Sequence, residues 1–334
     1  MRLGAVRITR DTGLKSRRAQ FLRAAGIRLL AGIPVFLLVT FGATALSDLM
    51  PGSAAEAILG GSATPQQIAT LNAEYGFTKP VYVRYWDWLV NLLHGNMGVT
   101  LFSQQSVLAV LIDRASVTFE LAFLAFAIAL IIAIPLALVS ALRPDGVVDS
   151  TLRGITSVIL SIPSFVTVVV LGYLFTIALG WFPATGWEPP SAGILNNLHY
   201  AGLPVLCLFP YECAFFFRVA RGEFISTLQE DFVLVARAKG LPTSYILTRH
   251  VLRPSLTPLL SFFGLSIGRL LGGSFIVENY FAVPGIGWTA VQAVGVKDIP
   301  TLQGILCLTV VVYIVVFILV DLGYALIDPR ISVA

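Results

Sequence analysis

Residues 232–254 read FVLVARAKGLPTSYILTRHVLRP, and this polar stretch determines how the rest of the chain is interpreted. Only 12% of the residues of the protein are charged, and apolar segments long enough to cross a bilayer lie on both sides of the stretch. It nevertheless holds five basic or imidazole side chains: Arg237, Lys239, Arg249, His250 and Arg253. Such a segment is expected at a membrane surface, where its polar groups stay hydrated.

The pattern predicts two short helices joined by a bend. Residues 230–239 contain no helix breaker and place two basic residues in the last turn, where the helix dipole favours cations. Gly240 is well placed as the residue just past this helix. Pro242 can open a second short helix, and Pro254 either ends it or marks re-entry into the membrane. The bent segment has an apolar side, which we expect to contact another protein: Val233, Ala236, Leu241, Ile246 and Leu247.

This stretch resembles the cytoplasmic coupling loop of permease subunits in bacterial ABC importers, and in particular the dipeptide and oligopeptide importer branch. Loops of that branch carry an acidic-aromatic pair, a gap and then Ala-Arg-Ala-Lys-Gly-Leu. Here these elements are Asp231-Phe232 and residues 236–241, with Phe232 where the branch usually has Tyr. Other segments also resemble the branch: Met50-Pro51-Gly52, Gly95-Asn96-Met97-Gly98, Ser161-Ile162-Pro163-Ser164-Phe165, residues 179–186, residues 278–287 and Asp328-Pro329-Arg330.

In that branch the bend of the loop sits in a surface groove of the cytosolic ATPase subunit. The resemblance therefore implies that the corresponding residues make this contact: Ala236, Arg237, Ala238, Lys239, Gly240, Leu241, Tyr245 and Ile246.

The whole chain has the composition of a polytopic membrane protein. It has 334 residues, and 57% of them are hydrophobic. The apolar segments predict an all-α integral membrane fold with six transmembrane helices, at residues 27–46, 117–142, 154–182, 201–217, 256–277 and 302–327. Pro163 is expected to kink the third span, and the fourth is expected to be short and interrupted by Pro204 and Pro210. The resemblance implies the type I ABC importer permease fold.

The distribution of Lys and Arg predicts the orientation in the cytoplasmic (inner) membrane. With the N-terminus inside, 17 basic residues lie on the inner side and four on the outer side, while Arg269 lies within a span. Residues 1–26 are then a basic cytoplasmic tail, and residues 27–330 form the transmembrane domain with a cytoplasmic C-terminus. The net charge of +4 is explained by this distribution and does not indicate nucleic-acid binding.

Two segments of the transmembrane domain are expected to lie outside the bilayer. Residues 218–254 form the cytoplasmic coupling segment. Residues 48–115 form an extracytoplasmic segment, expected to be irregular apart from an amphipathic helix near residues 83–93. That helix can lie at the lipid interface, dock a partner, or do both.

The sequence contains no recognisable catalytic constellation. Three histidines, His94, His199 and His250, lie in different loops, and no HExxH or GxxxxGK[ST] motif is present. The three cysteines lie in apolar segments without a CxxC pair, which favours neither a disulfide framework nor a zinc site. We therefore expect a non-catalytic chain with no cofactor or metal of its own, with ATP and Mg²⁺ held by partner subunits.

Ionisable residues within the spans are the remaining candidates for function, because burying a charge in a membrane is costly. Glu120 and Asp321 lie near span ends and are expected to have structural roles. Glu212 and Arg269 lie deeper, and either pair with each other or line a translocation path in which Arg269 meets a peptide carboxylate. Glu278, which opens the outer turn before the last span, is also assigned to the path.

Together these features predict one permease subunit of an ATP-driven importer that moves di- or oligopeptides by alternating access. The partners that the resemblance implies are a second homologous permease, two cytosolic ATPases and an extracytoplasmic solute-binding protein. Alternatives are a different cargo, such as nickel chelates, glutathione or haem, and an ATP-independent channel or secondary transporter. An integral-membrane enzyme is disfavoured by the missing catalytic cluster.

Overall fold

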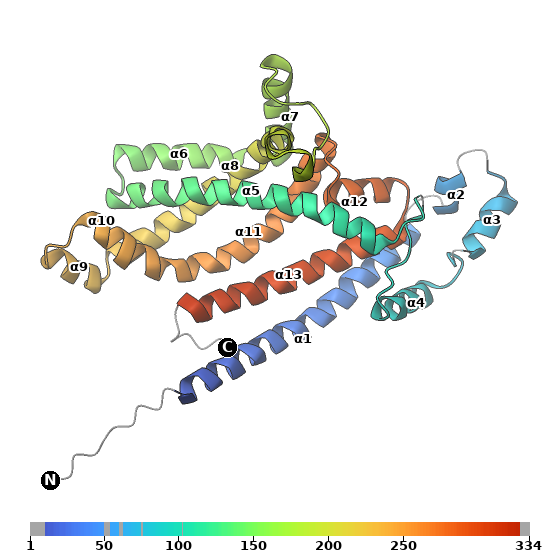
Figure 1. Cartoon of the computed structure of the whole chain (residues 1–334), viewed down its shortest axis with the longest axis horizontal. Coiled ribbons are helices and arrows are strands. Elements are labelled where there is room, and N and C mark those ends of the chain that lie inside the picture. Colours follow the sequence, from blue (N-terminus) through green and yellow to red (C-terminus); the bar gives the residue numbers. More distant parts are fainter. Residues whose placement is uncertain (1–10, 50–53, 60–62, 75, 102, 328–334) are drawn as a thin grey trace, which may run out of the picture.

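The computed structural model describes residues 11–49, 54–59, 63–74, 76–101 and 103–327 (Figure 1). Over these residues the chain is helical, with one isolated β-bridge between Val99 and Ser106, which confirms the all-α prediction. Residues 1–10 of the basic tail and the segments Met50-Pro51-Gly52 and Asp328-Pro329-Arg330 lie outside the described residues.

The α-helices, in chain order, are α1 (Asp11–Leu49), α2 (Ala54–Leu59), α3 (Pro65–Glu74), α4 (Val81–Leu93), α5 (Val107–Leu142), α6 (Val147–Ser161), α7 (Ser164–Gly172), α8 (Ile194–Leu228), α9 (Asp231–Ala238), α10 (Thr243–Tyr245), α11 (Leu252–Tyr280), α12 (Ile286–Gly295) and α13 (Ile299–Ile327). Two π-helical stretches continue these helices: η1 (Tyr173–Ala178) follows α7, and η3 (Ile246–Val251) joins α10 to α11. A short 3-10 turn, η2 (Pro190–Ala192), precedes α8.

In the part of the chain that the structure describes, five helical segments are long and apolar enough to cross a membrane: Gly26–Leu46, Val107–Leu142, Ile194–Leu228, Thr243–Tyr280 and Ile299–Tyr324. A sixth span arises if Val147–Ser161 and Ser164–Ala178 are counted as one broken span, because the two are bent by 96° at the short break between them. The structure therefore agrees with the predicted six-span fold, with the third span divided into two pieces.

The break in the third span has a local cause. Ile162 precedes a proline, which disfavours the helical conformation, and it is extended at φ −82° and ψ 122°. Pro163 is also non-helical, at φ −59° and ψ 140°, before α7 begins at Ser164. Pro163 was expected only to kink this helix. Two consecutive extended residues instead separate it into two helices that are nearly perpendicular to each other.

Several predicted boundaries were wrong because helices continue through expected breaks. Helix α8 runs unbroken through Pro204 and Pro210. Pro254 lies in the first turn of α11, so it does not end a helix, whereas the alternative in which it marks re-entry into the membrane is compatible with this position. Helix α1 extends back into the basic tail as far as Asp11. The outer segment is also not irregular: it contains α2, α3 and the first nine residues of α5 in addition to α4, the amphipathic helix predicted near residues 83–93.

Helices α5 and α8 form the centre of the fold, and small residues explain how they pack. Along α5, alanines recur at intervals of three or four residues and are all buried: Ala122, Ala125, Ala129, Ala133, Ala137 and Ala141. Because lipid provides no hydrophobic drive between helices, such small-residue stripes favour association by allowing close van der Waals contact. Phe216, Phe217 and Phe224 of α8 pack in one core cluster with three of these alanines, Ala133, Ala137 and Ala141.

Helix α1 packs along α13 and is fixed to it by an ion pair. Arg28 donates hydrogen bonds of 2.7 and 3.0 Å to the carboxylate of Asp321, whose side chain is only 5% exposed. The guanidinium also lies over the ring of Phe317. Asp321 therefore has the structural pairing role that its position near a span end suggested.

The two polar ends of the molecule lie far apart in Figure 1. Helices α2, α3 and α4 lie at one end. Helices α9 and α10, the first residues of α1 and the last residues of α13 lie toward the other end. The long helices between them connect the predicted extracytoplasmic segment to the predicted coupling segment.

Candidate functional site

The predicted coupling segment forms a tight helical hairpin whose turn is determined by Gly240. Helix α9 ends at Ala238, and Gly240 follows at φ +73°, a conformation that favours glycine. The N–H of Gly240 donates to the carbonyl of Arg237 at 2.9 Å, and that of Leu241 donates to the carbonyl of Ala236 at 3.3 Å. This pair of bonds is a Schellman motif, which caps the helix and fixes the direction of the chain beyond it.

One side of the hairpin is buried within this chain. Val233, Ala236 and Ile246 are between 0% and 4% exposed, and they join a core cluster with residues of α5, α8 and α11. These residues were expected to form the apolar side that contacts another protein. That expectation was wrong for these three side chains, because α8 and α11 extend far enough beyond the bilayer segment to cover them.

The opposite side of the hairpin presents a second set of apolar residues. Phe232, Leu234, Val235 and Tyr245 are 44–52% exposed, and Arg237 and Lys239 are exposed beside them. We refer to these six residues as the outer face of the hairpin. Of the residues predicted to contact an ATPase, Arg237, Ala238, Lys239, Gly240 and Tyr245 are exposed, Leu241 is half-buried, and Ala236 and Ile246 are buried.

The sequence interpretation missed Phe232, Leu234 and Val235 as surface candidates, although the run contained a signal. Four consecutive residues, 232–235, are apolar, so they cover more than one face of a helix. A short helix that is apolar on two sides requires a contact on each side. The core of this chain covers the side of α9 that carries Val233, and the other side stays exposed.

A buried charge network holds together the ends of α5, α6 and α8 that lie toward the hairpin (Figure 1). The side chain of Asp149 is 0% exposed and accepts a 2.7 Å hydrogen bond from Nη2 of Arg221. It also accepts bonds from the hydroxyl of Ser140 and, at 2.9 Å, from the backbone N–H of Asp145. Arg153 contacts the same carboxylate at 3.3 Å from a more exposed position. The network fixes the ends of these helices relative to one another.

Glu212 and Arg269 come together near the middle of α8 and α11. Nη2 of Arg269 lies 3.1 Å from Oε2 of Glu212, and Nε lies 3.3 Å from Oε1, so the two side chains form a bidentate pair. The guanidinium also stacks 3.8 Å from the ring centroid of Phe215 and donates to Ser266 at 2.6 Å. The pairing alternative drawn from the sequence is therefore present in the structure.

The same pair lines a cavity of about 420 Å³. Its walls come from the break between α6 and α7 and from α8 and α11: Leu160, Ser161, Ile162, Pro163, Ser164, Cys207, Leu208, Tyr211, Glu212, Arg269, Leu270, Gly273 and Val277. We refer to this space as the charged cavity. The two alternatives for Glu212 and Arg269 are thus compatible, because the residues pair with each other and also line an open space.

Glu278 has a different setting from that expected of a path residue. Its side chain is fully buried, and Oε2 accepts hydrogen bonds from the N–H groups of Gly287 at 2.7 Å and Trp288 at 3.1 Å. Thr118 donates to Oε1 at 2.8 Å and accepts from the N–H of Ile286 at 2.8 Å. The first three N–H groups of α12, which would otherwise lack partners, are thereby satisfied.

The two glycines of the Pro-Gly-Ile-Gly turn make room for this arrangement. A Cβ atom on Gly285 would lie 2.5 Å or less from the carboxyl group of Glu278, and one on Gly287 would lie 2.5 Å from the Cα of Phe275. Helix α12 itself was not predicted. Its position between α11 and α13 explains why a glutamate and two glycines recur in the outer turn.

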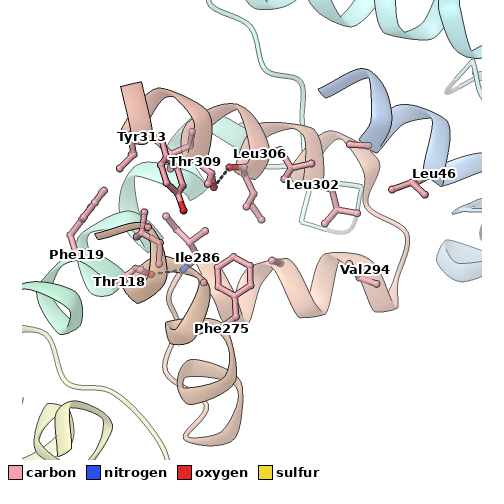
Figure 2. A pocket seen from close by; sticks show the side chains of 18 of the residues that line it. Leu46, Thr118, Phe119, Phe275, Ile286, Val294, Leu302, Leu306, Thr309 and Tyr313 are labelled. Carbon is pink, nitrogen blue, oxygen red and sulfur yellow. Dashed lines mark hydrogen bonds between the residues drawn. The ribbon is translucent and has the colours of Figure 1, made fainter. Parts of the chain in front are cut away.

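A larger cavity lies elsewhere and has a different character. It has a volume of about 740 Å³ and is bounded by α1, α5, α11, α12 and α13. Figure 2 shows Phe275 on α11 and Leu306 on α13 facing each other across it. Among its lining residues Thr118, Thr309 and Tyr313 are polar and none is charged, so it is suited to alkyl groups. The charged cavity is the better candidate for a polar solute.

The outer segment presents aromatic side chains on both sides of α4. Trp88 is buried and stacks with Phe36 of α1, and the hydroxyl of Tyr85 lies 3.0 Å from that of Thr40. Tyr82 and Trp86 are 68% and 64% exposed on the other side. An amphipathic helix with this aromatic exposure is compatible with both the lipid interface and a docking surface.

Comparison with known proteins shows the family to which the chain belongs. Residues 133–333 match the family described as "Binding-protein-dependent transport system inner membrane component", and residues 21–122 match the corresponding N-terminal family. The chain belongs to this family of membrane-spanning transport subunits. As a member, it is the non-catalytic permease component of an ABC transport system, in which separate subunits hydrolyse ATP, and it is a multi-pass membrane protein.

Similar proteins cover nearly the whole chain. A putative peptide transport system permease protein of Brucella abortus is 32% identical over 304 residues, which are 91% of this chain and 97% of that protein. A probable peptide ABC transporter permease protein of Sinorhizobium fredii is 33% identical with the same coverage. The glutathione transport system permease protein GsiC of Pectobacterium atrosepticum is 34% identical over 91% of this chain and 97% of that protein.

Proposed function

We propose that this chain is one of two permease subunits of an importer that moves di- or oligopeptides across the cytoplasmic membrane by alternating access. Two ATPase subunits on the cytoplasmic side and an extracytoplasmic solute-binding protein complete the assembly. Both termini are cytoplasmic, as the basic-residue distribution requires. ATP and Mg²⁺ belong to the ATPase subunits, and this chain holds no cofactor.

The observation that carries the proposal is the outer face of the hairpin. Phe232, Leu234 and Val235 are 44–52% exposed at the end of the molecule that the positive-inside rule assigns to the cytoplasm. Their backbone is rigid, because a Schellman turn and a buried second side hold it. A rigid, exposed apolar surface with basic residues beside it is more typical of a protein contact than of a solvent-exposed loop, and a groove on an ATPase would cover it.

The hairpin is also connected to the spans in a way that suits energy coupling. It follows α8 after two residues, Gln229 and Glu230, and leads through η3 into α11 without a break. A force on the hairpin therefore reaches both helices that line the charged cavity. The same connection would serve no purpose in a channel that opens without ATP.

Co-purification followed by reconstitution tests this function. The chain, expressed with its neighbouring genes, is purified through a tag and placed in proteoliposomes with the solute-binding protein. We expect two ATPases and a second permease to remain bound, and labelled di- or oligopeptides to accumulate only with ATP. Solute flux through the isolated chain under an ion gradient would contradict the proposal.

Glutathione is the second candidate cargo. The relative from Pectobacterium atrosepticum, named as a glutathione transport permease, matches over the same length and at similar identity to the peptide permeases. Glutathione is itself a small peptide with free carboxylates. Competition between labelled peptide and unlabelled glutathione in the same vesicles separates the two candidates.

A further inference from the structure

The charged cavity contains a cation whose hydrogen-bonding capacity is only partly used. A guanidinium has five N–H donors. Nε and Nη2 of Arg269 face Glu212 and Ser266, whereas Nη1 has no hydrogen-bond partner among the described residues. The side chain is 32% exposed, while that of Glu212 is 3% exposed. The carboxylate of Glu212 thus contacts one edge of the guanidinium, formed by Nε and Nη2, and the free Nη1 lies on the side away from Glu212.

The surroundings of this pair are unusual for a purely structural ion pair. A bidentate pair at the centre of a membrane protein is costly unless it has a partner helix or a polar space to face. Here it faces about 420 Å³, a volume within the range of small-ligand sites. The wall opposite α8 and α11 is the break at Ile162 and Pro163, where the chain is not helical. Broken helices near the middle of a membrane recur at transporter substrate sites.

The chemistry of the cargo identifies which group fits. Peptides of varied sequence share their backbone and their charged ends, so a site that serves many peptides has to contact these common groups. The free Nη1 of Arg269 carries two N–H donors and shares the positive charge of the guanidinium, so it is matched to a carboxylate through charge-assisted hydrogen bonds. The partly exposed ring of Tyr211, at 41% exposure on the cavity wall, provides apolar surface for a neighbouring side chain.

We propose that the charged cavity binds the C-terminal carboxylate of a peptide during translocation, through the free edge of Arg269 with Glu212 orienting the guanidinium. This inference rests on the proposed function and adds to it the group of the cargo that the permease itself contacts. The volume suits the last one or two residues of the peptide, and the rest of the peptide extends out of the cavity.

The test compares a peptide with its own C-terminal amide. ATP-dependent uptake of both compounds is measured in vesicles that contain the complete complex, with the wild-type chain or with Arg269→Gln. For each chain we compare the ratio of peptide-acid uptake to peptide-amide uptake. The solute-binding protein is the same with the wild-type chain and with the variant, so its own preference cancels when the two ratios are compared. We expect Arg269→Gln to lower this ratio by about tenfold to a hundredfold, as the loss of charge-assisted hydrogen bonds predicts.

Each outcome has a distinct meaning. An unchanged ratio, with uptake retained, would overturn the carboxylate site but leave the peptide importer intact. Absence of peptide uptake by the wild-type complex would instead contradict the proposed function. Gly222→Ala in α8 serves as the control, because its new methyl group meets no atom within 4 Å and it lies outside the cavity.

Two further variants separate a binding role from a latch between helices. The double variant Glu212→Arg with Arg269→Glu restores the ion pair with its charges exchanged. If the ion pair only holds the two helices together, this double variant should recover uptake and keep the preference for the peptide acid over the amide. If Arg269 binds the carboxylate, the double variant should assemble but lose that preference. Gly273→Val leaves the pair untouched and narrows the cavity, since the nearest atom to its Cβ is 4.0 Å away. We expect Gly273→Val to assemble normally and to reduce uptake of peptide acids, and normal uptake would count against the site.

Discussion

Two valines on α9, separated by one residue, provide the sharpest test of the hairpin. Val233 is fully buried in the core beside α8, whereas Val235 is 52% exposed on the outer face. The same substitution should therefore lower the free energy of unfolding much more at Val233 than at Val235. Replacing either valine by alanine removes two carbons and raises helix propensity by a similar amount at both positions, so propensity does not affect the comparison.

The expected magnitudes follow from burial. At Val233 the loss of two buried carbons costs about 1.6 kcal/mol of transfer free energy, and the cavity left behind raises the total to about 2 to 3 kcal/mol. At Val235 the free energy of unfolding of the chain should change by less than about 0.5 kcal/mol. Thermal unfolding of the purified chain in detergent, followed by near-ultraviolet circular dichroism or by size exclusion after heating, measures both values.

A second measurement reads the function of the outer face. Val235→Asp places a charge at the proposed ATPase contact without disturbing the core, so we expect normal thermal stability, loss of the ATPase subunits on purification and loss of ATP-driven uptake. Val233→Ala should lower stability while the assembled fraction still transports. The interpretation would be refuted if Val235→Asp retained its ATPases and transported normally, or if both alanine variants lost equal stability.

Three further predictions concern the turn, the charge network and the helix cap. Gly240→Val places a β-branched residue at φ +73°, so it should lower the free energy of unfolding by about 1 to 2 kcal/mol and uncouple ATP turnover from uptake. Gly240→Asn should be tolerated, because asparagine adopts this conformation more readily. The control Gly222→Ala, measured in the same assays, should have no effect. Asp149→Ala removes the carboxylate that pairs with Arg221, whose side chain is 18% exposed, and should lower the free energy of unfolding by about 3 kcal/mol. Arg153→Ala, which removes a half-exposed partner, should cost less than about 1 kcal/mol, and thermal unfolding measures both values. Glu278→Ala leaves two N–H groups of α12 without an acceptor and should lower the free energy of unfolding by about 3 kcal/mol. Glu278→Gln should have a smaller effect, because one acceptor oxygen remains. Equal unfolding midpoints for the two variants would argue against the capping role.

The prolines show which part of the fold a sequence can predict. Pro163 breaks its helix, yet Pro204 and Pro210 remain inside α8. Each proline removes one backbone hydrogen bond, and this local cost is similar at all three sites. The difference lies in tertiary packing, because α8 is held along its length by the alanine stripe of α5, whereas the exposed turn at Ile162 has no comparable support. Sequence reasoning therefore located the spans but could not decide which of them would break.

The candidate site was predictable to a similar degree. Arg237, Lys239 and Gly240 were correctly placed in a polar bend, since helix caps and turn glycines act through local rules. Glu278 was assigned to the path because its charge was visible in the sequence, whereas α12, which it caps, was not. Which charged residues face a cavity and which cap a helix depends on contacts between segments that are distant in sequence, and these contacts have no local signal.

The hairpin lies at one end of α8 and α11, and the charged cavity lies near the middle of these two helices. Glu212 is sixteen residues from the inner end of α8 at Leu228, a length of about 24 Å, and Arg269 is 26 residues from Thr243, where the second arm begins. At the hairpin the two arms are joined in one hydrophobic cluster, and at the cavity Leu208 of α8 and Leu270 of α11 belong to a second cluster beside the ion pair. A displacement imposed at the hairpin is consequently transmitted along stiff helices to the ion pair that lines the cavity. Val235→Asp and Arg269→Gln should therefore both reduce uptake of peptide acids for different reasons, the first by removing the driving force and the second by removing the group that holds the carboxylate.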